Sequence, residues 1–333
     1  MRSKKSKIKT CIVFLLVVTL LSTPVFAISA TGVRTDENVA PTAEDLDFTT
    51  YRGVVLHGNL MAADAEGDQF EFQIVRAPRR GEVELDSATG FFTYTPPDSR
   101  RNRDSFTYVA VDARGNISPE ATVNVRIERQ SAQVNYADMD GHFAHVAAIT
   151  LAENDIFIGE QLGNRHFFGP NTLVTRGEFL AMVMRLSDLE ILTDVTRTGF
   201  ADDDAIADWL KPYISTAVMN EVVRGISSCE GFIFNPNTFI TLGEASVMLN
   251  NAIGFADVPT AGNIMEDLAA PAWAHQATVN LRTSNIIPSE DADVYYQSLT
   301  RAEVALMLVS AIDYSEGRIP TQHSPLRWAL STT

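Results

Sequence analysis

Cysteine is scarce in this sequence, and lysine is almost absent after the N-terminus. The 333 residues contain two cysteines, Cys11 and Cys229, and Lys211 is the single lysine beyond residue 9. Because Cys11 falls in an apolar segment that we expect to be removed, one cysteine remains and an intrachain disulfide is excluded. The folded protein must therefore be stabilised by buried apolar side chains.

The N-terminus has the composition of a secretory signal. Five basic residues precede an apolar run over residues 12–21, which is too short to span a bilayer comfortably, and Val25-Phe26-Ala27 offers small residues for cleavage. We therefore expect residues 1–27 to be removed and the protein to be secreted. No later segment is apolar enough to cross a membrane.

Acidic residues dominate the expected mature chain. The whole sequence has 26 basic and 42 acidic residues, and removal of residues 1–27 leaves 21 basic and 42 acidic ones, a net charge of −21. Such a surface repels nucleic acid and anionic lipid, so we expect neither as a partner. The remaining 306 residues are enough for two or more domains.

Residues 41–129 have the two-residue periodicity of β-strands. Alternating runs such as residues 105–111 and 121–127 are separated by turn signals, for example Gly67-Asp68, at intervals of roughly ten residues. About seven strands in about ninety residues predict an all-β, immunoglobulin-like sandwich. The preceding polar residues 28–40 are expected to form a flexible leader.

Several acidic residues of this β region are weak candidates for binding calcium. Calcium takes six to eight oxygen ligands, which carboxylates gathered at one end of the sandwich would supply. Their spacing does not match an EF-hand loop, and capping of turns is the favoured explanation for them. The candidates are Asp64, Glu66, Asp68, Asp104 and Asp112.

From residue 134 the periodicity becomes helical, and the chain repeats itself three times. Asp138, Asp202 and Asp267 recur at intervals of 64 and 65 residues. Each unit is too small to bury a core alone, and each predicts a helix, a polar loop and a second helix. We expect an all-α, three-lobed unit followed by a polar tail over residues 315–333, to which we assign no role. The repeats cover residues 134–190, 198–255 and 262–314.

Each predicted second helix begins with a Thr-x-x-Glu capping box. The threonine at the N-cap accepts a hydrogen bond from the first helical turn, and the glutamate three positions later accepts one from the N-cap backbone. We therefore assign these residues a structural role. They are Thr175 and Glu178, Thr241 and Glu244, and Thr300 and Glu303.

An arginine follows the capping threonine in two of the three copies. Arg176 and Arg301 stand in the first helical turn, where positive charge is unfavourable, and capping does not require them. We expect them to point outward. There a planar guanidinium suits a carboxylate-bearing ligand, and a surface salt bridge is an equally good explanation.

The β region resembles bacterial immunoglobulin-like or cadherin-like modules. The resemblance rests on Gly81 before a strand, on Phe92-Thr93-Tyr94-Thr95-Pro96 and on Asp104-Ser105-Phe106-Thr107-Tyr108. Such modules serve as spacers, adhesins and carbohydrate binders alike, so the resemblance names no ligand.

The three repeats resemble the S-layer homology domain. The signature includes Tyr136-Ala137-Asp138, Phe168-Gly169-Pro170 and Thr300-Arg301-Ala302-Glu303. The resemblance implies that the first helices share a central bundle and that grooves between lobes bind secondary cell wall polymer, often a pyruvylated glycan. It implies further that the motif arginine meets the ketal carboxylate, while a tryptophan and a loop glycine line the sugar site. The candidate ligand-binding residues are Arg176, Arg301, Trp209, Trp273, Gly159 and Gly225.

Two departures from the family pattern predict fewer functional grooves than lobes. Leu242 replaces the arginine in the second copy, and Ser289 stands where the earlier copies have Gly159 and Gly225. We expect the groove that depends on position 242 to lack its carboxylate contact.

We expect a non-catalytic protein of the cell wall or S-layer that displays its β module on the surface. The sequence has no Gly-x-Ser-x-Gly, His-Glu-x-x-His, P-loop or cysteine-pair metal motif. His142 and His145 beside Asp138 suggest a metal cluster, but a partly exposed helix face explains them more simply. Paired carboxylates for glycosidase chemistry stay open at this level.

Three alternative functions also stay open. The β module of an adhesin would bind an external glycan or protein. The chain would otherwise be an accessory subunit of a wall-bound enzyme, or a tether in a two-membrane bacterium whose repeats bind modified peptidoglycan.

Overall fold

In the computed structural model, the chain is described over residues 38–98, 100–187, 189–259, 270–287 and 292–318. The expected signal, most of the expected leader, Asp267, Ser289 and the end of the tail lie outside these ranges. Within the described residues, none of the helices combines the length and the apolar character needed to span a bilayer.

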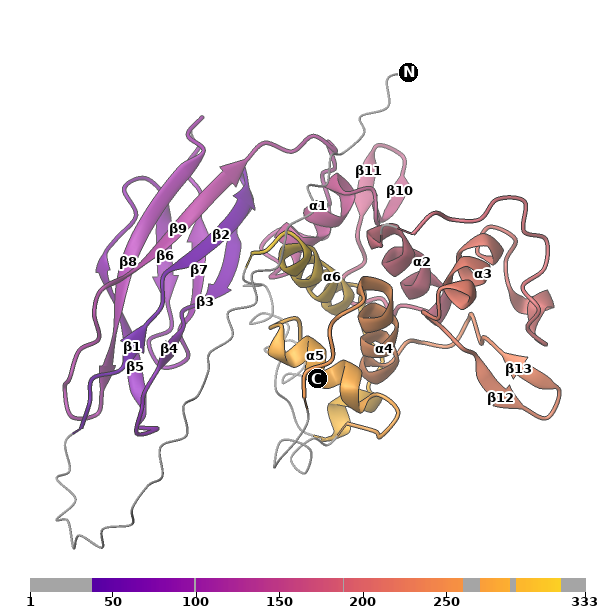
Figure 1. Cartoon of the computed structure of the whole chain (residues 1–333). Coiled ribbons are helices and arrows are strands. Elements are labelled where there is room, and N and C mark those ends of the chain that lie inside the picture. The colour runs from indigo at the N-terminus through magenta and orange to yellow at the C-terminus, as the bar shows by residue number, and fades with distance from the viewer. Residues whose placement is uncertain (1–37, 99, 188, 260–269, 288–291, 319–333) are drawn as a thin grey trace, which may run out of the picture. The chain divides into compact units, whose positions relative to one another are not determined.

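The N-terminal part is all-β and consists of two main sheets, as predicted (Figure 1). Its strands are β1 (Thr42–Ala43), β2 (Leu46–Tyr51), β3 (Leu56–Asn59), β4 (Ala62–Ala63), β5 (Phe70–Arg76), β6 (Glu82–Leu85), β7 (Phe91–Thr95), β8 (Arg103–Asp112) and β9 (Ala121–Glu128). The larger sheet has the order β2-β9-β8-β5 and the smaller the order β3-β7-β6, with β1 and β4 as a separate pair. Strands β2 and β9 run parallel, and the other neighbours run antiparallel.

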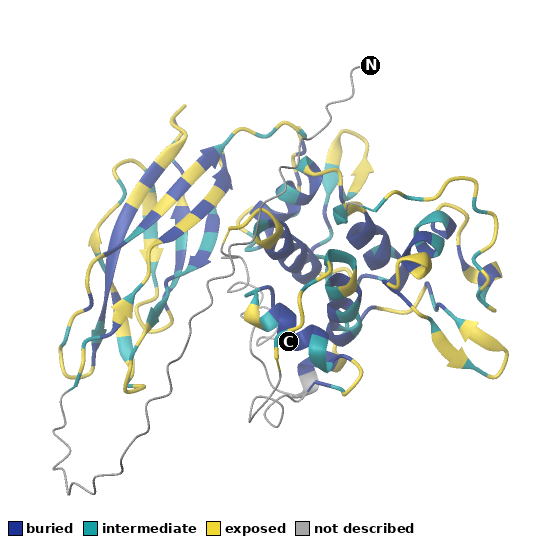
Figure 2. Ribbon diagram, in the orientation of Figure 1, coloured by how far each residue is buried: buried dark blue, intermediate teal, exposed yellow. Residues whose placement is uncertain are grey.

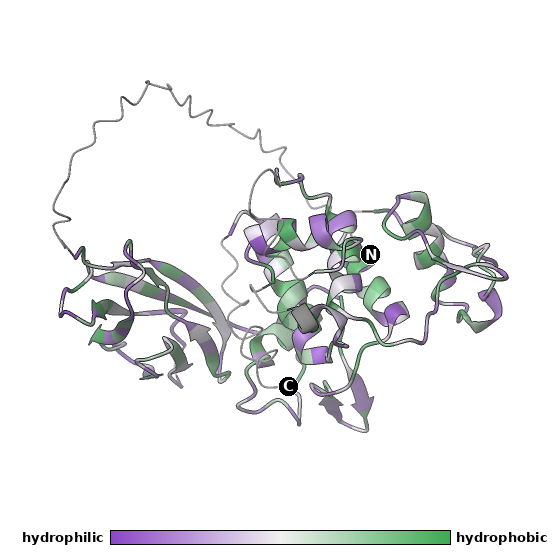
Figure 3. Ribbon diagram, turned by 90° about the horizontal axis from the view of Figure 1, so that it is seen from below, coloured by the Kyte–Doolittle hydropathy of each residue, from purple (hydrophilic) through white to green (hydrophobic). Residues whose placement is uncertain are grey.

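Aromatic side chains from both sheets form the core of this sandwich. Buried and more exposed residues alternate along β9 (Figure 2), and the hydropathy of the strands alternates in the same way (Figure 3). The fully buried ring of Phe92 on β7 meets Phe48 and Phe106 of the other sheet edge-on, each at a centroid distance of 5.3 Å. The period-2 pattern therefore places one face of each sheet against the other.

The C-terminal part consists of helices and two small hairpins. The first repeat has α1 (His145–Glu153), β10 (Glu160–Leu162), β11 (Arg165–Phe167) and α2 (Arg176–Leu186). The second has η1 (Asp203–Ala205), α3 (Lys211–Met219), β12 (Ile226–Ser228), β13 (Gly231–Ile233) and α4 (Leu242–Ile253). The third has α5 (His275–Thr283), η3 (Ala292–Tyr296) and α6 (Arg301–Ser315).

The prediction of an all-α unit is wrong, because two repeats contain an antiparallel hairpin where a polar loop was expected. In the first hairpin Glu160 pairs with Phe167, and in the second Ile226 pairs with Ile233. Each strand has three residues. Strands this short show too few alternations to be recognised against a polar background.

A closed ring of backbone hydrogen bonds joins the three repeats. The amide of Val174 donates to the carbonyl of Leu299, Leu299 donates to Ile240, and Ile240 donates back to Val174, each at 2.9 Å. These three buried residues each directly precede a capping threonine. Every repeat thus gives one amide and one carbonyl to the ring, so the third repeat is an integral part of the unit.

The second helix of each repeat, rather than the first, takes the central position. Helix α2 contacts both α4 and α6, while α1 packs on α6, α3 on α2, and α5 on α4. In α6 every residue over 302–312 is buried. The arrangement therefore differs from the implied central bundle of first helices, because each first helix covers the second helix of the neighbouring repeat.

Candidate ligand-binding site at the repeat junctions

All three capping boxes form. The hydroxyl of Thr175 accepts the amide of Glu178 at 3.2 Å, and the carboxylate of Glu178 accepts the amide of Thr175 at 2.9 Å. Thr241 with Glu244 and Thr300 with Glu303 make the same reciprocal bonds. Each box fixes the start of a second helix, and thereby the position of the residue that follows the threonine.

The repeated aspartates hold the turn that faces this helix start. Both carboxylate oxygens of Asp138 accept backbone amides, from Phe168 at 2.9 Å and from Gly169 at 2.7 Å. Asp202 does the same for Phe234 and Asn235, at 2.9 and 2.8 Å. In the sequence these aspartates were markers of the repeat only. An aspartate 30 residues before Phe168 and 32 residues before Phe234, each followed by the Phe-x-Pro turn, was the signal that could have revealed their role.

Arg176 does not point outward, and that prediction is wrong. Its Nε donates to the carbonyl oxygen of Phe234 at 2.9 Å, and its Nη1 pairs with Glu244 at 3.1 Å. The guanidinium carbon lies 5.2 Å from the centroid of the Phe234 ring, and the side chain is 9% exposed. Burial lowers the pKa of Arg176, while the charge of Glu244 acts in the opposite direction. We call this contact between the first and second repeats the 1–2 junction.

Arg301 also turns toward a neighbouring repeat, so the prediction that it points outward is wrong as well, but its ion-pair partner is exposed. Its Nη1 donates to the carbonyl oxygen of Phe168 at 3.1 Å, and its Nη2 pairs with Glu160 at 3.0 Å. Its guanidinium carbon lies 5.2 Å from the centroid of the Phe157 ring. The Arg301 side chain is 12% exposed and that of Glu160 is 63% exposed. This contact, between the third and first repeats, is the 3–1 junction.

The 2–3 junction has the same backbone geometry without the charge. The amide of the buried Leu242 donates to the carbonyl of Gln297 at 3.1 Å, as Arg176 donates to Thr238 and Arg301 to Thr172. A Cβ added at Gly243 would lie 3.3 Å from the Trp273 ring, so the indole lies close to this helix start. Leu242 replaces the guanidinium with an apolar side chain and leaves the fold unchanged.

The two candidate tryptophans are exposed beside different junctions. Trp209 is 57% exposed and Trp273 is 58% exposed. Leu210, the neighbour of Trp209, packs where Gly177 follows Arg176. Trp273 thus lies beside the helix start of Leu242 at the 2–3 junction, whereas at the 1–2 junction the contact with Gly177 is made by Leu210, the residue after Trp209.

The candidate loop glycines shape the backbone beside the hairpins. Gly159 and Gly225 both have a φ of +79°, a conformation that favours glycine. A Cβ at Gly159 would lie 2.4 Å from the carbonyl oxygen of Phe167, and one at Gly225 would lie 2.4 Å from the Phe200 ring. Gly159 sets the direction of the next residue, Glu160, and so belongs to the 3–1 junction.

The candidate calcium ligands do not gather at one end of the sandwich. Asp104 and Asp112 lie near opposite ends of β8, and a separation of eight positions along an extended strand spans roughly 26 Å. Asp112 accepts the amides of Arg114 and Asn116, and Asp64 accepts those of Glu66 and Asp68. In the described part of the chain no three histidine, cysteine or acidic residues are grouped as metal ligands would be. These carboxylates cap turns.

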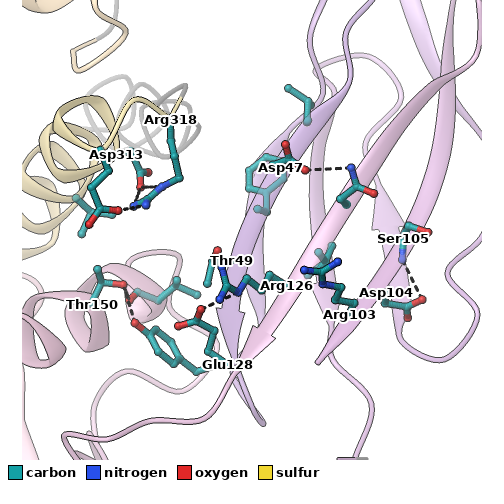
Figure 4. A pocket seen from close by; sticks show the side chains of 18 of the residues that line it. Asp47, Thr49, Arg103, Asp104, Ser105, Arg126, Glu128, Thr150, Asp313 and Arg318 are labelled. Carbon is teal, nitrogen blue, oxygen red and sulfur yellow. Dashed lines mark hydrogen bonds and ion pairs between the residues drawn. The ribbon is translucent and has the colours of Figure 1, made fainter. Parts of the chain in front are cut away.

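Asp104 has the most extensive contacts of these aspartates. It accepts the amide of Gly81 at 2.9 Å, that of Ser105 at 3.0 Å and the hydroxyl of Tyr94 at 3.1 Å (Figure 4 shows the contact with Ser105). Burial raises the pKa of Asp104, but these hydrogen bonds outweigh burial and lower it below its usual value. The ionised carboxylate therefore stabilises the loop before β6.

Comparison with known families agrees with this architecture. The model of the bacterial cadherin-like domain matches residues 38–129, and that of the S-layer homology domain matches residues 135–180 and 199–246. The chain therefore contains a bacterial cadherin-like domain followed by S-layer homology domains. The third repeat lies beyond these matches, and its place in the unit rests on the ring of backbone bonds.

Two curated proteins share part of the sequence. The Surface-layer 125 kDa protein of Lysinibacillus sphaericus is 29% identical over 159 residues, which are 44% of this chain and 13% of that protein. An amylopullulanase of Thermoanaerobacterium thermosulfurigenes is 27% identical over 197 residues, which are 52% of this chain and 10% of that enzyme. The chain thus spans a small fraction of the length of each relative.

Solved structures resemble parts of the chain at low scores. The SrpA adhesin of Streptococcus sanguinis aligns with a TM-score of 0.24 at 20% identity, covering 32% of this chain and 65% of that one. The human Desmocollin-1 ectodomain aligns with a TM-score of 0.23 at 16% identity, covering 28% and 20%. At these scores the likeness carries no argument about function.

Proposed function

We propose that this chain is a non-catalytic, secreted surface protein that binds an acidic secondary polymer of the cell wall, such as a pyruvylated glycan, at its repeat junctions. The observation that carries the proposal is the guanidinium of Arg301, which the neighbouring repeat holds at the 3–1 junction beside an exposed carboxylate. A planar guanidinium recognises a carboxylate through charge-assisted hydrogen bonds. The cadherin-like domain is then displayed on the wall.

The charge of the protein supports localised recognition of such a polymer. The chain has a formal net charge of −16, so an acidic polymer is repelled by most of its surface. Binding then depends on the few positions where a cationic side chain is accessible to the polymer. The exposed rings of Trp209 and Trp273 add apolar surface beside two of the junctions.

The amylopullulanase relative supports a second candidate function. That protein is named as an enzyme, and it shares 197 aligned residues with this chain. In this alternative the chain is an accessory subunit that attaches a wall-bound enzyme. Co-purification of a glycosidase with the full chain from the cell envelope would favour it, and recovery of the chain with wall polymer alone would contradict it.

Sedimentation of the full chain with purified cell wall tests the main proposal. We expect the protein to pellet with intact wall and to remain in solution after chemical removal of the secondary polymer. The matched control is cell wall taken through the same procedure without the reagent that removes the polymer. Equal binding to stripped and intact wall would disprove the proposal.

A further inference from the structure

The 3–1 junction contains an arginine whose ion-pair partner lies in solvent. Glu160 on β10 is 63% exposed and meets Arg301 at 3.0 Å. Among the described residues, its carboxylate makes no other recorded hydrogen bond. An exposed carboxylate of this kind is held weakly and exchanges its partner at little cost.

Arg301 stays in place without Glu160, because two other contacts position it. The carbonyl oxygen of Phe168 accepts its Nη1, and the ring of Phe157 packs against the guanidinium. Gly169 leaves the required space, since a Cβ there would lie 2.9 Å from Nη1. With five N–H donors and two bonds recorded in the described chain, the guanidinium has donors left for a ligand.

At the 1–2 junction, a ligand carboxylate cannot readily replace the carboxylate that pairs with the arginine. Glu244, the partner of Arg176, is 24% exposed, and its other carboxylate oxygen accepts the amide of Thr241 in a capping box. Replacing Glu244 by a ligand would therefore break the start of α4. The hairpin position equivalent to Glu160 is Ile226, which offers no charge at this junction.

The 2–3 junction offers no cation to a carboxylate. The residue at its helix start is Leu242, whose side chain is buried. The three junctions therefore share one backbone geometry and differ in what a charged ligand would meet.

We propose that Glu160 occupies, in the free protein, the position that a ligand carboxylate takes at Arg301, so that the 3–1 junction is the charge-recognising site. Glu160 then lowers the affinity of this site by competing with the ligand. The ligand class is an acidic sugar with one accessible carboxylate, so this inference rests on the proposed function.

Titration calorimetry of the full chain with a 4,6-O-pyruvylated hexoside tests the inference. We expect Glu160→Gln to bind the acidic probe at least threefold more tightly than the unchanged protein. The methyl ester of the probe should bind weakly to both. Arg301→Gln should lose at least tenfold in affinity for the acidic probe.

Glu230→Gln is the matched control, because it removes the same charge from the hairpin of the second repeat, where Glu230 is exposed and no arginine partner is recorded for it in the described chain. It should leave the affinity unchanged. Unchanged or weaker binding by Glu160→Gln, with the melting temperature preserved, overturns the role of Glu160 alone. Failure of the unchanged protein to bind both the probe and purified wall polymer overturns the proposed function as well.

Discussion

At the scale of single residues, two arginines in the same motif position have different environments. Arg176 is buried against Phe234 and Glu244, whereas Arg301 has an exposed partner. The difference arises from their neighbours. Val223 and Ile226 in the second repeat stand where the first repeat has Phe157 and Glu160. The same motif position therefore supports a structural role at one junction and the proposed binding role at another.

Arg176→Ala should lower the free energy of unfolding by roughly 3 kcal/mol, because it leaves the carboxylate of Glu244 and the carbonyl of Phe234 without their partner in a largely buried setting. Urea denaturation at neutral pH measures the change. Arg224→Ala is the control. Both side chains of the Arg224–Glu221 ion pair are exposed, so its loss should lower the free energy of unfolding by about 0.5 kcal/mol or less. Similar losses in the two variants would contradict the structural role of Arg176.

Asp104→Asn should destabilise the sandwich more at neutral than at acidic pH. The pKa of Asp104 is lowered in the folded protein, so its contribution is present above the pKa of an unfolded aspartate and is lost as the pH falls through the lower folded value. Urea denaturation should show that the free energies of unfolding of the unchanged protein and the variant differ at pH 7 and approach each other at pH 3. Asp47→Asn, at an exposed position bonded to Asn124 (Figure 4), is the control and should change the free energy of unfolding at pH 7 by about 0.5 kcal/mol or less.

At the scale of elements, the turn between each hairpin and its second helix connects the fold to the proposed binding site. Asp138 holds the amides of Phe168 and Gly169, and the carbonyl of Phe168 holds Arg301. The capping box of Thr300 fixes the helix on which Arg301 stands. A backbone turn and a helix start, from opposite ends of the repeat unit in sequence, thus determine where the guanidinium lies.

Asp138→Ala should therefore reduce both stability and affinity for an acidic glycan. We expect a loss of about 2 kcal/mol from the two unpaired amides, with weaker binding because the Phe168 carbonyl is no longer held. Thermal melting and calorimetry on the same samples measure both effects. Asp140→Ala, an exposed neighbour, should change neither, and full retention of affinity by Asp138→Ala would exclude the proposed coupling.

At the scale of the whole molecule, the repeats form a closed unit rather than an open row. The ring through Val174, Ile240 and Leu299 takes one amide and one carbonyl from each repeat. Helix α1 of the first repeat packs on α6 of the third. A repeat in an open solenoid contacts only its neighbours in sequence, so closure makes the first and third repeats depend on each other.

Truncation after residue 259 should consequently unfold the first two repeats together. It removes α6, exposes the apolar face of α1 and leaves the amide of Val174 without its acceptor. Circular dichroism should show loss of the helical signal and of its cooperative melting, while the β signal of the sandwich persists as an internal control. A truncated chain that keeps a cooperative helical transition would refute the mutual dependence.

The local features of this protein were determined by its sequence alone. The capping boxes and the boundary between strand and helical patterns could be predicted because each depends on residues a few positions apart. The three repeats could be predicted because their motifs recur at nearly constant intervals. The position of Leu242 directly after Thr241 also showed that the second repeat lacks the motif arginine.

Only the tertiary structure decided the direction of the arginines and the central position of the second helices. The acceptors of Arg301 at Phe168 and Glu160 lie 133 and 141 residues away in the chain, and that of Arg176 at Phe234 lies 58 residues away. The direction of each guanidinium depends on the hydrogen-bond acceptors that lie near it in the folded protein. Those partners come from other repeats, and no pattern within one motif contains them.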